Sequence, residues 1–480
     1  MKRILLLIIL LSTTSQTIHS QTVVLDANGV TVKWTGTTVP TPYFVQANPR
    51  GTGMEWFAIV NNSTTSNITN YAKNIPSGIT FFTRPGTTTP IPFDNIVTTL
   101  VTNMSFMFYQ VTSFNQLISS WDVSNVTNMS SMFGGTSFNQ TIGSWNVSNV
   151  TNMDRMFVGD HSFNQPIGSW NVGNVTNMSS MFVGANSFNQ PIDSWNVSNV
   201  TNMDSMFDNA YAFNQPIGSW NVSNVTNMEG MFLSAISFNQ SIGTWNVSNV
   251  TDMLYMFASA TSFNQPIGSW NVSNVSTMFG MFWEANAFNQ PIGSWDVSRV
   301  INMSRMFQSA TSFNQPIGSW NVTNVTDMQF MFSDVGLSTN NYDALLIGWS
   351  TISPNETPLK PNVVFSGGNS NYCNGATARS SIISTYGWTI TDAGLNCALD
   401  TDEFETNTLK LYPNPVLSVL NIKADFKNVN QPYTIIDGLG RVVINGKLTE
   451  VESTINVEQL SKGIYYLKIA GNSANKFIKE

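Results

Sequence analysis

The chain has 480 residues, of which only 10% are charged, whereas about a quarter are charged in an average soluble protein. The deficit lies between Thr102 and Val335, where there is no lysine and 3 arginines stand against 12 carboxylates, a local charge of −9. Phosphate binding requires lysine and arginine, so this stretch argues against a nucleic-acid partner. The only two histidines are His19 and His161, which argues against catalytic triads and histidine zinc sites.

The first 20 residues have the pattern of a secretory signal peptide. Lys2 and Arg3 precede an apolar run over 4–11, and polar residues follow as far as Ser20. The run is too short to cross a bilayer, so we expect cleavage before Gln21. No later stretch approaches about 18 consecutive apolar residues, so we expect no membrane span in the mature protein.

Between residues 97 and 335 the sequence repeats about every 25 residues. Tryptophan recurs nine times from Trp121 to Trp320, a Met-x-x-Met-Phe cluster recurs ten times, and Phe-Asn-Gln recurs nine times. One such unit cannot bury its own apolar face, whereas stacked units share a continuous core in which each Trp, Met and Phe packs on its copy in the next coil. The sequence therefore predicts an array of about ten stacked coils.

The unit over 142–163 indicates how each coil folds. Its first apolar residues are spaced i, i+3, i+5 and include a Trp-x-Val step with the period of a short strand; they are Ile142, Trp145 and Val147. The next are spaced i, i+3, i+6, i+7, as on one face of about two helical turns; they are Val150, Met153, Met156 and Phe157. We expect a strand, then a short helix or 3₁₀ turn capped by Ser148 or Asn149, then a return loop. The asparagine of Phe-Asn-Gln is expected to form an inward hydrogen-bonded ladder at the corner of each coil.

The i, i+3, i+5 opening is the strand signature of a leucine-rich repeat, with Ile, Trp and Val in place of Leu. The whole unit, WNVSNVTNMxxMFxxAxxFNQPIG, resembles the BspA-type leucine-rich repeat of bacterial surface proteins. Residues 25–32 (LDANGVTV) resemble the lead-in strand of that family, and 341–349 (NYDALLIGW) and 384–390 (STYGWTI) resemble its C-terminal cap.

The resemblance implies a mainly β fold with short helices, a leucine-rich-repeat-like solenoid of about ten 25-residue coils. The expected organisation follows from it. It consists of a signal peptide at 1–20, an N-terminal lead-in or cap at 21–96, the repeats at 97–335, a C-terminal cap of the array at 336–400, a linker at 401–407 and a final domain at 408–480.

Cys373 and Cys397 are the only cysteines, and both lie in the expected cap. Two cysteines in an exported chain favour one structural disulfide. A reactive thiol is the alternative, but no histidine and no cluster of lysine and arginine is close in sequence to either residue to activate it.

From about Thr408 the composition changes, with 9 Lys and Arg against 6 acidic residues. Short alternating runs separated by Gly, Asn and Asp turns predict a small antiparallel, Ig-like β-sandwich. This segment resembles a type A C-terminal sorting domain of the type IX secretion system, through 411–415 (LYPNP), 437–441 (DGLGR), 460–466 (LSKGIYY) and 476–480 (KFIKE). The resemblance implies that the type IX machinery handles 408–480 and that the passenger is secreted or held on the outer cell surface. The alternative is a carbohydrate-binding or generic Ig-like module.

Several residue patterns suggest chemistry but have simpler interpretations. Paired methionines are soft copper ligands, yet each pair precedes Phe at core spacing, which favours packing. The Asn-x-Ser/Thr triplets match a glycosylation acceptor but follow from the repeat itself. His161 replaces Asn, Thr or Ala of other coils and is expected to be a solvated loop residue. No two acids recur in a fixed relation, and no phosphate loop or nucleophile elbow occurs, so we expect no catalytic, cofactor-binding or metal-ligating residue.

The coils differ most between the two methionines and just after the phenylalanine. Leu254, Tyr255, Phe279 and Trp283 fall at these positions on consecutive coils, and we hypothesise that they form one exposed patch that contributes to partner binding. The alternative is that these side chains pack laterally against one another or against a cap loop.

These observations favour a non-catalytic protein, without a cofactor, that is secreted or displayed on the outer cell surface. We expect it to mediate adhesion or protein–protein recognition, with a protein or glycan ligand on a cell surface or matrix. A lectin-like glycan-binding protein is the alternative, and a carbohydrate-active enzyme is the weakest one.

Overall fold

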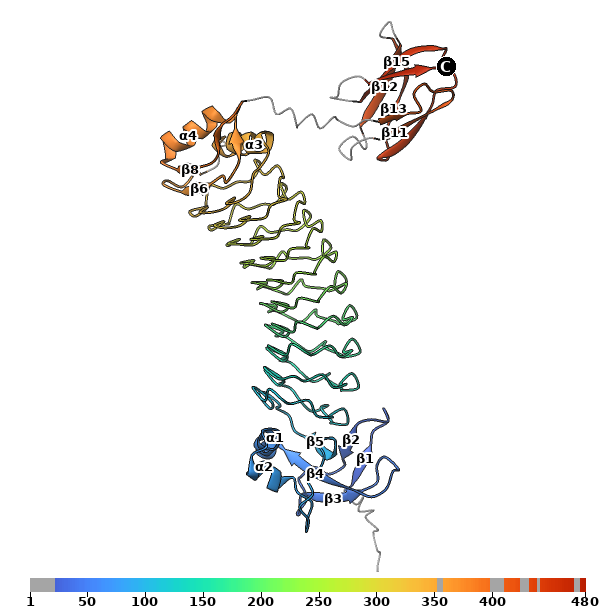
Figure 1. Cartoon of the computed structure of the whole chain (residues 1–480), viewed down its shortest axis with the longest axis vertical. Coiled ribbons are helices and arrows are strands. Elements are labelled where there is room, and N and C mark those ends of the chain that lie inside the picture. Colours follow the sequence, from blue (N-terminus) through green and yellow to red (C-terminus); the bar gives the residue numbers. More distant parts are fainter. Residues whose placement is uncertain (1–21, 352–356, 398–409, 424–430, 438–440, 470–474) are drawn as a thin grey trace, which may run out of the picture. The chain divides into compact units, whose positions relative to one another are not determined.

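The computed structural model divides the chain into two compact units, Met1–Asn396 and Cys397–Glu480 (Figure 1). The expected signal peptide and the expected linker at 401–407 lie outside the described residues. Within the described part of the chain, no helix has the length and apolarity to cross a membrane. The structure describes residues 22–351, 357–397, 410–423, 431–437, 441–469 and 475–480.

The N-terminal region forms a small β-rich cap with two short α-helices and two 3₁₀ helices. Its strands are β1 (Val23–Leu25), β2 (Val32–Trp34), β3 (Phe44–Ala47), β4 (Glu55–Asn61) and β5 (Ile96–Leu100). Its helices are η1 (Asn62–Thr64), α1 (Thr65–Ala72), α2 (Pro76–Phe81) and η2 (Phe93–Asn95). β1 and β2 form an antiparallel pair, while β4 pairs antiparallel with β3 and parallel with β5. Asn61 stops β4 and caps η1, since its Oδ1 accepts the Ser63 N–H.

The region from Val101 to Ser338 is a stack of coils with a repeating unit of about 25 residues, as predicted (Figure 1). None of these residues belongs to a helix or a strand. The strand expected at Trp145–Val147 and a helix from Val150 to Phe157 are therefore wrong, and of the expected short helix or 3₁₀ turn only single turns are present. Parallel β-bridges do join each coil to the next, but they lie at the position of Asn152, within the segment expected to be helical.

Backbone hydrogen bonds that run from coil to coil explain this difference. Met153, Arg155 and Phe157 donate their N–H groups to residues of the next coil, namely to the carbonyls of Asn177, Ser179 and Met181 at 2.9–3.0 Å. The residues between them close local turns, as in the 3.2 Å bond from the Met156 N–H to the Met153 carbonyl. Alternate amides thus point along the stack, whereas a helix would direct every one of them to the residue four positions earlier.

This alternation requires a left-handed backbone at two positions in each coil. Arg155 has φ 52° and Gly159 has φ 67°, and the equivalent residues of every coil also have positive φ. Most of them are Ser, Gly or Asn. The first column contains Phe106, Ser131, Arg155, Ser180, Ser205, Gly230, Tyr255, Gly280, Arg305 and Phe330. The second contains Gln110, Gly135, Gly159, Gly184, Asn209, Ser234, Ser259, Glu284, Ser309 and Asp334. Left-handed residues cost roughly 1–2 kcal/mol each, and the bonds between coils offset this cost.

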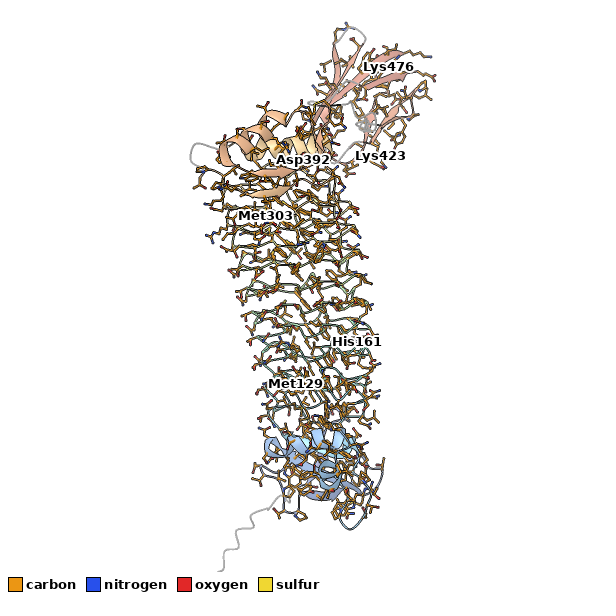
Figure 2. All side chains as sticks on the ribbon, turned by 60° about the vertical axis from the view of Figure 1, so that its left-hand side comes forward. Met129, His161, Met303, Asp392, Lys423 and Lys476 are labelled. Atoms are coloured by element: carbon orange, nitrogen blue, oxygen red, sulfur yellow. The ribbon has the colours of Figure 1, made fainter. Side chains whose placement is uncertain are left out.

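Columns of identical side chains fill the interior. The indoles of Trp145 and Trp170 lie parallel at 6.5 Å, and from Trp145 to Trp320 each Nε1–H of the column donates to an Ile carbonyl of the preceding coil, as Trp170 does to Ile142 at 3.0 Å. The rings of Phe157 and Phe182 stack at 5.7 Å. All twenty methionines of the Met-x-x-Met pairs are buried in this core, and Met129 and Met303 mark two levels of it in Figure 2. The Met pairs therefore pack, as the sequence favoured.

Two columns of asparagine hold the coils together at their edges. We call the Asn of each Phe-Asn-Gln a corner asparagine; Asn189 Oδ1, for example, accepts the Asn214 N–H at 3.0 Å and Gln215 Nε2 at 2.9 Å. The expected ladder is thus present, but its members are half-buried or exposed and do not point inward. The other column includes Asn149, which was expected to cap a helix and instead donates to the Ser124 carbonyl at 2.7 Å.

The C-terminal cap closes the stack by continuing its hydrogen bonds. Its elements are α3 (Thr339–Ser350), β6 (Val364–Ser366), β7 (Asn371–Tyr372), α4 (Ala376–Tyr386), β8 (Thr389–Thr391) and β9 (Gly394–Leu395). Phe332 of the last coil donates its N–H to Ser366 in β6. Asp343 of α3 is buried and accepts the N–H groups of three residues, Cys373, Asn374 and Gly375, at 2.7–2.8 Å. Cys373 and Cys397 are both disulfide-bonded.

The second unit contains two antiparallel sheets. One has the strand order β10-β11-β14 and the other β13-β12-β15-β16. Their bounds are β10 (Lys410–Tyr412), β11 (Val419–Lys423), β12 (Pro432–Asp437), β13 (Val442–Lys447), β14 (Glu452–Asn456), β15 (Gly463–Ile469) and β16 (Asn475–Lys479). Leu420 of the first sheet and Ile435, Leu467 and Phe477 of the second share one buried core.

Replacing a corner asparagine tests whether its side-chain oxygen stabilises the stack. Asn189→Ala removes the acceptor of two donors in the next coil, and we expect unfolding to become easier by about 1–2 kcal/mol in denaturant titrations. Amide exchange at Asn214 should accelerate as well. Asn189→Asp keeps the oxygen and should behave like the parent chain. Equal losses in both variants would contradict this role of the oxygen.

Candidate interaction surface

The three aromatic residues of the hypothesised patch come together on the surface of the stack. The ring of Tyr255 meets that of Phe279 edge-on at 5.1 Å and that of Trp283 at 6.0 Å. Leu254, Tyr255, Phe279 and Trp283, which we call the aromatic patch, are all half-buried. Tyr255 lies directly over Gly280, where a Cβ would come within 2.5 Å of its ring. The three aromatic side chains therefore pack laterally on one another and still keep part of their surface exposed.

The next coils extend this surface with a further ring and a cation. Phe330 is 46% exposed, and the guanidinium of Arg305 lies 4.7 Å from its ring centroid. Arg305 also donates to Gln308 Oε1 at 2.7 Å, which fixes the guanidinium. Arg305 and Phe330 occupy the same left-handed column as Tyr255, so the backbone presents all three side chains in equivalent directions.

On the preceding coils, acidic residues occupy the columns of Leu254 and Trp283. Burial raises the pKa of Asp208 to about 6. A hydrogen bond from Asn209 lowers this pKa, and the charge of Asp204 raises it further. Burial also raises the pKa of Glu229, with smaller contributions from the charges of Asp204 and Asp252. Among the described residues, no group of three or more His, Cys, Asp or Glu is arranged to hold a metal ion.

Asp160 is a buried carboxylate that the sequence reasoning missed. It occupies a column that is Ala in six later coils, and it is fully buried. Burial raises its pKa from 3.8 to about 7, although Thr136 Oγ1 donates to it at 2.9 Å. An acid in a column that otherwise holds Thr136 and apolar residues was the signal available in the sequence. The neighbouring His161 is exposed, with its Nδ1 2.7 Å from the Gly184 carbonyl oxygen.

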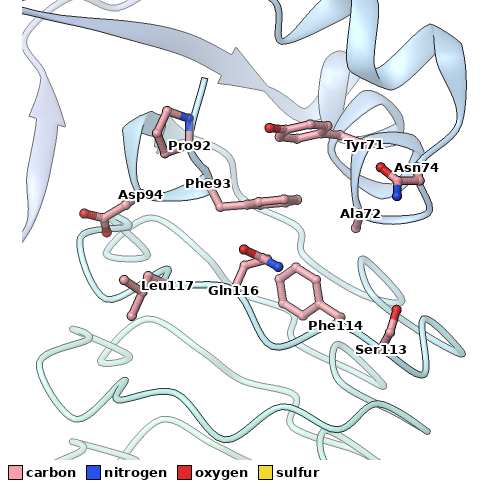
Figure 3. A pocket seen from close by; sticks show the side chains of 10 residues that line it. All are labelled: Tyr71, Ala72, Asn74, Pro92, Phe93, Asp94, Ser113, Phe114, Gln116 and Leu117. Atoms are coloured by element: carbon pink, nitrogen blue, oxygen red, sulfur yellow. The ribbon is translucent and has the colours of Figure 1, made fainter. Parts of the chain in front are cut away.

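A hollow of about 390 Å³ lies between the N-terminal region and the first coils (Figure 3). Its aromatic walls pack on each other, since Tyr71 stacks on Phe93 at 4.6 Å and Phe93 meets Phe114 edge-on at 5.4 Å. Arg50 forms an ion pair with Asp94 at 3.0 Å, so this carboxylate is already neutralised. The hollow offers amides and apolar surface, with no nucleophile beside a base.

The stack of 25-residue coils and the separate C-terminal sheets define a repeat protein with an additional domain at its C-terminus. Residues 80–186, 134–243, 159–265 and 237–345 match the family of Mycoplasma proteins of unknown function DUF285, whose repeats are BspA-like. These matches together span more than half of the chain, and the chain therefore belongs to this family.

The C-terminal unit has a separate match. Residues 410–480 match the secretion system C-terminal sorting domain. The protein is therefore exported by the type IX secretion system to the cell surface or the extracellular space, and this confirms the expected location. No curated protein matches the chain.

The pKa of Asp160 predicts how the stability of the stack depends on pH. A carboxyl whose pKa is raised in the folded state stabilises the fold only while protonated, so stability should fall as pH rises from about 4 to about 7. Asp160→Ala, which restores the residue of later coils, should abolish this fall and raise the unfolding free energy at pH 8 by up to about 4 kcal/mol. Chemical unfolding of both chains at pH 4, 6 and 8 measures the difference, and parallel curves would refute the assignment.

Proposed function

We propose that this chain is a non-catalytic recognition protein that, once exported, binds a protein on a cell surface or in a matrix. In this proposal the stack is a BspA-type, leucine-rich-repeat-like solenoid, and the C-terminal unit is an Ig-like sorting sandwich of type A. A stacked array supports such a role because it presents equivalent side chains of successive coils in rows over an extended surface.

The observation that carries the proposal is the aromatic patch. Most variable positions hold Ser, Gly, Asn or acids, whereas Tyr255, Phe279 and Trp283 gather three aromatic rings on two adjacent coils. Half-buried Tyr and Trp held by neighbouring side chains are the residues that most often dominate binding energy at protein interfaces. Their mutual packing fixes the rings before binding, which lowers the entropy lost on contact.

The acidic residues support a binding role over a catalytic one. The carboxyl with the most clearly raised pKa, Asp160, is fully buried and cannot reach a substrate. Burial raises the pKa of the half-buried Asp208, the charge of Asp204 adds to this rise, and a hydrogen bond from the Asn209 amide opposes it. The buried position of Asp160, the carboxyl with the largest rise, favours recognition over catalysis.

Two substitutions test the patch without disturbing the core. Tyr255→Ser installs the residue most common in its left-handed column, and Trp283→Ala installs the residue of the preceding coil, Ala258. We expect the double variant to bind intact cells or matrix proteins at least tenfold more weakly than the parent chain, as loss of a binding hot spot requires.

Tyr211→Ala provides the matched control, because Tyr211 is 41% exposed but lies outside the patch. The control should bind like the parent chain in the same cell-binding titration. Unchanged binding of the double variant would refute a role for the patch. Binding of the parent chain to a glycan array and to no protein would favour the lectin-like alternative.

A further inference from the structure

A second hollow, of about 590 Å³, lies on a different side of the coils, near the C-terminal end of the stack. Its volume is within the roughly 300–1,000 Å³ typical of small-ligand sites. The last coils and one residue of the cap contribute to it. Its lining residues are Thr251, Asn274, Ser276, Arg299, Ile301, Asn324, Thr326 and Lys360.

The hollow coincides with a local break in two regular columns. At the position of Arg299, each of the other coils from Asn125 to Asn324 has an asparagine. Its side chain donates to a carbonyl of the preceding coil, as Asn324 does to Ser298 at 2.8 Å. We call these the anchor asparagines; they are Asn125, Asn149, Asn174, Asn199, Asn224, Asn249, Asn274 and Asn324. Two positions later the column is Thr or Ser in every coil from Thr127 to Thr326 except at Ile301. The coil that contains Arg299 and Ile301 thus has a cation in place of an anchor amide. It also has an apolar side chain in place of a hydroxyl.

These replacements are not needed to hold the coils together. The backbone bonds of the column continue through the break, since the Ile301 N–H donates to Ser276 and the Thr326 N–H donates to Ile301, both at 2.9 Å. Arg299 Nη1 donates to the Asn274 side-chain oxygen at 2.7 Å, which holds the guanidinium beside the hollow. Ile301 remains 52% exposed. The stack therefore retains its architecture while presenting a positioned cation and an uncovered apolar side chain.

The charge of the hollow is positive and uncompensated within the described residues. Neither Arg299 nor Lys360 forms an ion pair there. The carboxylates nearest in sequence to the lining residues do not line the hollow, and each accepts the backbone N–H two residues further on: Asp252 from Leu254, Asp296 from Ser298 and Asp327 from Gln329. Arg299 is one of only 3 arginines between Thr102 and Val335, a stretch without lysine, so this pair of cations is exceptional on the stack.

We propose that this hollow binds an acidic saccharide, a sugar unit that carries a carboxylate or a sulfate. Arg299 and Lys360 hold the anionic group, since a guanidinium offers paired N–H donors to two oxygens of such a group. The amides of Asn274 and Asn324 and the hydroxyl of Ser276 hydrogen-bond the sugar hydroxyls, and Ile301 packs against its C–H face. The surrounding charge of −9 disfavours a long polyphosphate, whereas a single sugar needs only the local pair of cations.

This site is independent of the proposed protein-binding role. The aromatic patch occupies the columns between the paired methionines and after the phenylalanine, and the hollow occupies the anchor-asparagine column and the Thr column. The two surfaces share no residue. Either can therefore fail experimentally without affecting the other.

The double variant Arg299→Asn, Ile301→Thr tests the proposal by restoring the regular columns. It installs an anchor asparagine and a column threonine, so we expect a melting temperature equal to or higher than that of the parent chain. The probes are a sulfated heparin hexasaccharide, a carboxylated hexagalacturonate and neutral maltohexaose, titrated by calorimetry against the full chain. The parent chain should bind at least one acidic probe but not maltohexaose, and the double variant should lose at least tenfold in affinity.

Further variants separate the site from general electrostatics. Lys360→Gln should also weaken binding of the acidic probe, whereas Arg155→Ser, which removes an arginine outside the hollow, should leave it unchanged. Preference for the heparin or the galacturonate probe identifies sulfate or carboxylate as the recognised group. The proposal is overturned if the parent chain binds neither acidic probe, if inorganic sulfate binds as tightly as the saccharides, or if the double variant binds as well as the parent.

Discussion

The structure depends on hydrogen bonds that run from the backbone of each coil to the backbone of the next. Because alternate amides such as those of Met153 and Phe157 find their acceptors in the next coil, a lone coil leaves them without a partner. The fixed length of about 25 residues follows, since every residue must lie opposite its own copy. The Trp, Met and Phe columns, the corner asparagines and the anchor asparagines are all consequences of this register.

The same constraint limits which positions of a coil can carry a specific binding function. Positions that serve the register are nearly identical in every coil, so they carry little information about a particular ligand. The proposed recognition role therefore rests on departures from the repeat, and two surfaces gather several of them. One holds Tyr255, Phe279 and Trp283, and the other holds Arg299 and Ile301 beside Lys360 of the cap.

The sequence predicted the number of coils, the buried columns and the export domain, because each depends on a periodic pattern or a specific motif. It failed on local backbone structure. Spacing of i, i+3, i+6 and i+7 at Val150, Met153, Met156 and Phe157 fits a helix, but it fits equally a chain of turns in which right-handed and left-handed residues alternate. The cationic hollow was also not predictable, since Lys360 is distant in sequence from Arg299 and only the folded cap brings them together.

The left-handed columns also limit how this surface can diversify. Their twenty members include Phe, Tyr, Arg, Gln and Glu alongside Ser, Gly, Asn and Asp, yet none of them is Val, Ile or Thr. A β-branched side chain fits poorly at positive φ, whereas aromatic and long charged side chains, unbranched at Cβ, are tolerated. Substitutions tolerated at these sites are therefore mainly aromatic, charged or small polar residues. The positive φ of the backbone thus favours side chains of the kinds that are common at binding surfaces.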